Sequence, residues 1–228
     1  MTGARRPTPM SLGPAALIAL ASALAALALS GGNDAQAHGE HAAANDAVTS
    51  SELALRQGMR SLWEDHVSWT RLAIVSLTTA SPDTKATVAR LLRNQSDIGK
   101  AIEPYYGAKA GNELTRLLRE HILVAADLIA AAKAGDRTKL ASEQRAWQRN
   151  ADHIAAFLAN ANPAAWKLTE MRTMLQTHLA LTTQEVVARL EGKWNADVRA
   201  YDAIVKQALG MADMLSEGII RQFPARFA

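Results

Sequence analysis

One helical pattern occurs three times in this chain, as Leu62-Trp63-Glu64-Asp65-His66, Leu118-Arg119-Glu120-His121 and Met174-Leu175-Gln176-Thr177-His178. The histidines of these segments are 55 and then 57 residues apart. A period of that length corresponds to one helix-turn-helix hairpin. We therefore expect an all-α fold, a six-helix bundle built from three antiparallel helical hairpins that arose by internal triplication.

The second helix of each expected hairpin also carries a related segment. These segments are Arg93-Asn94-Gln95-Ser96-Asp97-Ile98, Arg149-Asn150-Ala151-Asp152-His153-Ile154 and Met211-Ala212-Asp213-Met214-Leu215. Turn and breaker residues separate the six apolar stripes. No stretch alternates with period two, so no sheet is expected. Coincidence in a chain rich in Ala and Leu is the alternative to duplication.

The N-terminus is typical of a signal peptide. Arg5 and Arg6 precede an apolar run, residues 15–29, which is shorter than a membrane-spanning helix. Ala35-Gln36-Ala37 matches a processing site, so we expect cleavage between Ala37 and His38 and export by the general secretory route. An uncleaved membrane anchor is the alternative. The expected organisation is a signal peptide (1–37), a flexible leader (38–50), a helical bundle domain (51–224) and a tail (225–228).

Composition excludes several classes of protein. The chain has no cysteine, which rules out disulfides, thiolate metal sites and a lipid anchor. Its formal net charge is +3, with basic and acidic residues interspersed, so nucleic acid is not an expected partner. There is no phosphate-binding loop, no G-x-G-x-x-G and no G-x-S-x-G. No catalytic constellation emerges, and no transmembrane segment is expected after processing.

The candidate chemistry is a metal site. Each of His66, His121 and His178 lies within an apolar stripe, and three neutral imidazoles from separate helices can bind zinc or copper. Asp152, Asp213 or water would complete the site. This requires a closed bundle, because in a linear solenoid the rings would lie about 9–10 Å apart. The alternative is that each histidine only packs and bonds to a neighbouring helix.

Two further features have alternative interpretations. Cleavage would leave His38 as the first residue, with His41 three residues later. The free α-amine of His38, together with its imidazole, can chelate copper, and the alternative is an unstructured leader that happens to begin with histidine. The segment Arg149-Asn150-Ala151-Asp152 is either a polar cluster between helices or a solvated flank, and we favour the flank. The five tryptophans are expected in the core.

The chain resembles a family of exported bacterial all-helical proteins of unestablished function. The resemblance spans roughly residues 52–227 and rests on five segments: residues 62–71, 91–94, 103–107, 150–158 and 217–224. Members are sometimes labelled glycosyltransferase or acetylglutamate kinase, but either activity would need alternating strands and helices around a nucleotide site. The resemblance implies the fold and export, and it assigns no catalytic residue.

Together these features predict an exported, non-enzymatic binding protein that holds zinc or copper through the three helix-borne histidines. The alternative is a structural or protein-interaction bundle without metal, and a third option is a hydrolase with an unrecognised site between helices. The sequence identifies no particular partner beyond a metal ion or another protein.

Overall fold

The computed structural model describes residues 48–228, and every regular element in this range is a helix. Five α-helices follow one another before a short 3₁₀ helix: α2 (Ser50–Thr79), α3 (Thr84–Ala134), α4 (Arg137–Ala161), α5 (Leu168–Leu190), α6 (Trp194–Gln222) and η2 (Pro224–Arg226). The expected all-α class is therefore confirmed, since the described range contains no strand. The expected signal peptide, its cleavage site, His38 and His41 lie outside the described residues.

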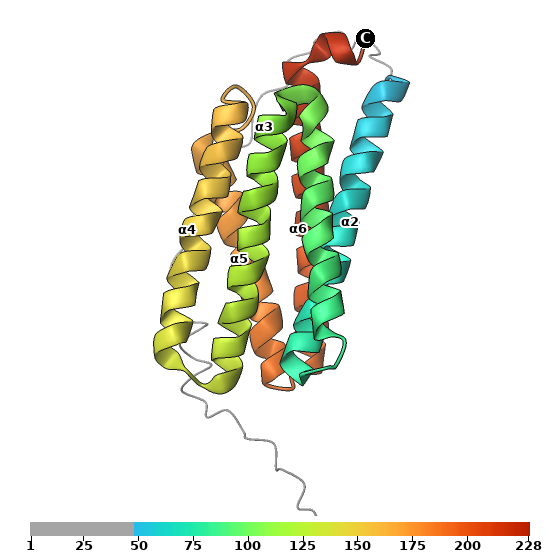
Figure 1. Ribbon diagram of the computed structural model, residues 1–228. Helices are drawn as coiled ribbons and strands as arrows, with labels where there is room; N and C mark the ends of the chain where they lie inside the picture. The colour runs from blue at the N-terminus through green and yellow to red at the C-terminus, as the bar shows by residue number, and fades with distance from the viewer. Residues whose placement is uncertain (1–47) are drawn as a thin grey trace, which may run out of the picture.

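The structure has five α-helices in this range where six are expected, and the difference lies in α3. Gly107, with φ 82° and ψ 163°, interrupts α3, and the chain reverses direction there (Figure 1). The two runs of α3, residues 84–106 and 108–134, approach closely at two glycines. A Cβ on Gly99 would lie 2.5 Å from the carbonyl oxygen of Gly111, so a larger residue could not occupy this crossing without backbone movement.

Replacing Gly107 with alanine is expected to lower the free energy of unfolding by about 1–3 kcal/mol, because this φ and ψ combination is accessible almost only to glycine. Urea denaturation measures the change. Gly58→Ala is the matched control, since Gly58 is exposed within α2 and has nothing near an added Cβ. That control should stabilise the helix by about 0.5–1 kcal/mol, and a Gly107→Ala variant as stable as Gly58→Ala would contradict the argument.

The helices form a closed bundle. α3 packs on α2 and α4, α5 packs on α4 and α6, and α6 returns to α2, so the last long helix closes on the first (Figure 1). α2 also contacts α5 across the bundle. This closure puts the middle of α2, of the second run of α3 and of α5 around a common interior.

Local capping explains where the helices begin and end. Thr49 and Glu52 form a capping box at the start of α2, and Asp136 caps α4 by accepting from the backbone N–H of Lys139. Gly135, with φ 71°, ends α3 in the left-handed conformation. These caps fix the lengths of the helices and hence the height at which their side chains meet.

Both ends of the described chain meet at one end of the bundle. Ser51 donates a hydrogen bond from its hydroxyl to the carbonyl oxygen of Phe227 at 3.3 Å. Phe227 is buried and stacks on Tyr105, with ring centroids 5.8 Å apart. Phe227, one of the residues expected as a tail, is therefore packed against the bundle, whereas the other three are exposed. No helix in residues 48–228 combines the length and the apolar character needed to cross a bilayer.

Candidate functional site

The bundle interior brings the three predicted histidines together. His66 on α2, His121 on α3 and His178 on α5 are all buried. The ring of His178 lies 6.0 Å from that of His66 and 6.2 Å from that of His121, centroid to centroid. The closed arrangement that the metal hypothesis requires is therefore present, and we call these three side chains the histidine cluster.

The Nδ1 atom of each ring contacts a side-chain amide that lies 29 residues later in the chain. The three contacts are Gln95 at 3.2 Å from His66, Asn150 at 2.8 Å from His121, and Gln207 at 3.1 Å from His178. The amide-bearing segments belong to the first run of α3, to α4 and to α6. Asn150 is 1% exposed, so the expectation that this segment forms a solvated flank was wrong for Asn150.

The same amides also bond backbone carbonyls one turn before the histidines. Asn150 donates from Nδ2 to the carbonyl oxygen of Leu117 at 3.0 Å, and Gln207 donates from Nε2 to that of Met174 at 3.2 Å. In the first hairpin Asn94 does this instead, donating to Leu62 at 3.0 Å. Each of these carbonyls lies four residues before its histidine, so the pattern of bonds repeats with the pattern of sequence.

These bonds define the tautomers of two rings. Because the Nδ2 of Asn150 is used as a donor, its Oδ1 accepts from His121, and the proton of His121 is on Nδ1. The Nε2 of His121 then accepts from the indole N–H of Trp147 at 3.2 Å. Gln207 fixes the Nδ1–H tautomer of His178 in the same way, which leaves the Nε2 lone pair of His178 available.

His66 departs from this pattern. The Nε2 of Gln95 can only donate, so the Nδ1 of His66 accepts and the proton of the neutral ring is on Nε2. The Oε1 of Gln95 is buried and has no hydrogen-bond partner within residues 48–228. Rotation of the Gln95 amide would bring Oε1 toward Nδ1 and give His66 the tautomer of the other two rings.

Burial keeps the imidazoles neutral. The pKa of His66 is lowered to about 3, chiefly by desolvation and then by repulsion from His178 and His121. The pKa of His121 is lowered to about 4, again by desolvation first and by His178 second. Desolvation also lowers the pKa of His178, against a hydrogen bond that His178 donates to Gln207 and that raises it. Neutral imidazoles are the form that binds metal ions.

The cluster approaches the geometry of a metal centre without reaching it. Three rings bound to one ion at about 2 Å would have centroids roughly 5 Å apart, and the two closest pairs here are 6.0 and 6.2 Å apart. Within the described range, no group of three or more His, Cys, Asp or Glu side chains is close enough to hold a metal ion. The centroids of these two pairs would have to approach each other by about 1 Å.

The two predicted carboxylates lie elsewhere. Asp152 is about half exposed and pairs with Arg172 at 3.3 Å. Asp213 forms a two-bond ion pair with Arg60, at 2.6 Å for each bond, on the surface. The Arg60 hydrogen bond lowers the pKa of Asp213. Neither carboxylate joins the buried histidine cluster in this structure.

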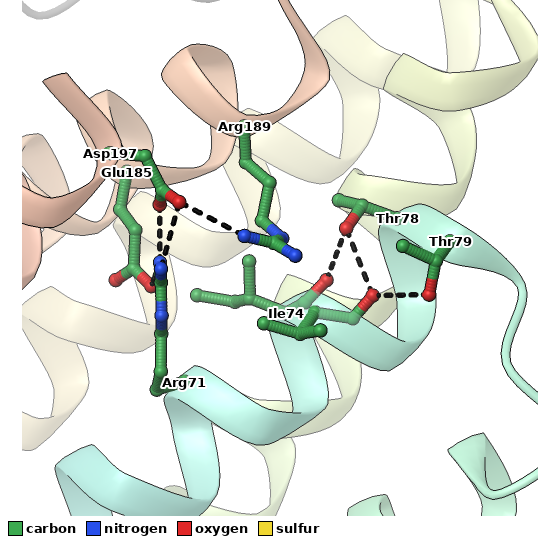
Figure 2. Close-up of polar contacts among 8 residues, drawn as sticks. Arg71, Ile74, Thr78, Thr79, Glu185, Arg189 and Asp197 are labelled. Carbon is green, nitrogen blue, oxygen red and sulfur yellow. Dashed lines mark hydrogen bonds and ion pairs between the residues drawn. The ribbon is translucent and has the colours of Figure 1, made fainter. Parts of the chain in front are cut away.

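The structure contains a second buried polar group, which was not predicted from the sequence. Arg71 on α2 donates to Glu185 on α5 at 2.7 Å and makes two bonds to Asp197 on α6, while Arg189 donates to Asp197 at 2.9 Å (Figure 2). Both carboxylates are about 1% exposed. Burial raises the pKa of Glu185, and the Arg71 hydrogen bond lowers that of Asp197. The signal in the sequence is Glu185, a carboxylate within the apolar stripe of α5. The sequence did not identify Arg71 as its partner.

Comparison with known protein families, with curated proteins and with solved structures finds no match to this chain. The resemblance to exported helical proteins therefore stays a prediction, and the case for function rests on the geometry of the histidine cluster.

Proposed function

We propose that this protein is an exported, non-enzymatic binding protein that holds zinc or copper through His66, His121 and His178. The observation that carries the proposal is the convergence of three buried imidazoles, with centroids 6.0 and 6.2 Å apart, from three helices far apart in sequence. Such a convergence of nitrogen ligands suits a borderline-soft transition metal.

The surroundings of the rings support this proposal. Histidines that bind a metal through Nε2 commonly have Nδ1 fixed by a hydrogen bond that sets the tautomer and the ring orientation. Asn150 and Gln207 do this for His121 and His178. Binding would not require these two rings to lose a proton, because both Nε2 atoms carry lone pairs.

The fourth position of the site is best assigned to water. Asp152 and Asp213 would each have to leave an arginine and the surface to reach the rings. A three-histidine site completed by water needs no such movement and is an established zinc arrangement.

The triplication and export belong to the same proposal. The constant offset of 29 residues between each histidine and its amide supports descent from one hairpin, and the reversal at Gly107 divides the five α-helices into six helical runs. Export rests on the basic, apolar and small-residue pattern of residues 1–37.

A purely structural role for the histidine cluster is the second candidate. The indole N–H of Trp147 already uses the lone pair of His121 that a metal would need. In this case the imidazoles and amides serve to satisfy buried polar groups and to fix how the hairpins pack.

Metal analysis separates the two candidates. Untagged protein is expected to contain zinc or copper, or to take up about one ion per chain, and to gain thermal stability when the metal is added. His178→Gln should abolish this gain, because it removes the ring that contacts both others. His153→Gln removes an exposed histidine of α4 and is the control. Protein that binds neither metal would support the structural role.

A further inference from the structure

Trp147 contacts the histidine cluster at the Nε2 of His121, the nitrogen that would bind the metal. Its indole N–H lies 3.2 Å from the Nε2 of His121, the two rings are 5.3 Å apart, and the side chain is 4% exposed. A hydrogen-bond donor and a metal ion both require the lone pair of this nitrogen. They cannot share it.

Helix α4 holds His121 from both sides. Trp147 and Asn150 are three residues apart and therefore lie on one face of the helix. Trp147 bonds the Nε2 of His121 and Asn150 bonds the Nδ1. The ring cannot turn away from the indole without breaking its bond to Asn150, so a metal would have to displace the indole itself.

This indole is a feature of one hairpin alone. The residues three before the other two amides are Leu92, before Gln95, and Ile204, before Gln207. Neither side chain has a donor. The repeated pattern therefore provides an amide for the Nδ1 of each histidine without an indole, and Trp147 is an addition at a single histidine.

We infer that Trp147 regulates the proposed metal site by occupying the lone pair of His121, so that the ion must displace its indole N–H. The inference rests on the proposed function. The displaced N–H would be left in a dry interior without a partner, and losing one such bond in a buried site weakens binding on the order of tenfold. Trp147 thus sets the affinity of the site and makes metal entry depend on displacement of its indole.

Trp147→Phe is the test. Phenylalanine keeps an aromatic ring beside His121 and removes the N–H, so the dissociation constant for Zn²⁺ or Co²⁺ should fall about tenfold. Trp166→Phe is the matched control: Trp166 is 2% exposed, and its indole nitrogen has no hydrogen-bond partner among the residues the structure describes. That replacement removes the same atoms from the core without releasing a lone pair. Competition titrations and the visible absorption of bound Co²⁺ give the affinities.

The outcomes separate the inference from the function on which it rests. Tighter binding by Trp147→Phe than by both wild type and Trp166→Phe supports the inference. Binding by all three proteins with equal affinity overturns the inference and leaves the metal site standing. Failure of all three to bind overturns both. If phenylalanine prevents folding, benzothienylalanine at position 147 keeps the bicyclic shape without the N–H and makes the same comparison.

Discussion

Acidification from pH 7 to pH 5 is expected to lower the free energy of unfolding of the metal-free protein by about 4 kcal/mol. In the unfolded chain each histidine takes up a proton near pH 6.5, whereas in the folded chain the pKa of His66 is about 3 and that of His121 about 4. Between these values the unfolded state binds more protons, so stability rises with pH and is lost as pH falls. His66 and His121 each contribute about 2 kcal/mol over this interval, and the lowered pKa of His178 acts in the same direction.

Urea denaturation at pH 7, 6 and 5 measures this loss. The raised pKa of Glu185 acts in the opposite direction, because its buried carboxyl gains a proton more readily when folded, but one carboxyl does not offset three imidazoles. Replacing one histidine of the cluster, for example His121→Leu, should reduce this loss by about 2 kcal/mol. Equal pH dependence in wild type and in such a variant would show that the rings are not held neutral by burial.

The fold class could be predicted from the sequence because helical periodicity and turn residues are local signals. The reversal at Gly107 gives a weaker local signal than the other turns. Gly107 is the single residue with non-helical φ and ψ, and the two runs of α3 are joined without a loop. The packing of Gly99 against Gly111 that accompanies this reversal is a tertiary contact, which no local pattern reports.

The convergence of His66, His121 and His178 could be anticipated because equivalent positions of repeated hairpins face the same interior when the bundle closes. Only some of their amide partners could be recognised from the sequence. Asn94 lies 28 residues after His66, and Asn150 lies 29 residues after His121. Gln207 has a longer side chain than these two asparagines, so their pattern does not include it. The signal in the sequence that identifies Gln207 is its offset of 29 residues from His178, the same as that of Asn150 from His121.

The cluster of Arg71, Glu185, Asp197 and Arg189 could not be found in this way, because it has no counterpart in the other hairpins. Its residues come from α2, α5 and α6, and their contact depends on how the first hairpin packs against the third. Such pairing is set by the closed bundle and not by any local spacing.

Replacing Arg71 with methionine is expected to lower the free energy of unfolding by about 3 kcal/mol or more. The guanidinium of Arg71 is the cation that both buried carboxylates share (Figure 2). It also lies over the ring of Tyr201, 5.3 Å from the ring centroid. Without it, Asp197 retains Arg189, while Glu185, which is 1% exposed, keeps no direct ion pair among residues 48–228. A buried carboxylate without a partner costs more than the pair contributes.

Arg60→Met provides the matched control for this change, since Arg60 also makes two bonds to one aspartate but is about half exposed. Exposed ion pairs contribute little, so this variant should remain close to wild type. The deficit of Arg71→Met should also shrink when Glu185→Gln is added, because glutamine occupies the site without a charge. If both arginine variants lose the same stability, or if the added glutamine recovers none of it, then desolvation of Glu185 is not the cause. The loss would then come from the packing of the Arg71 side chain.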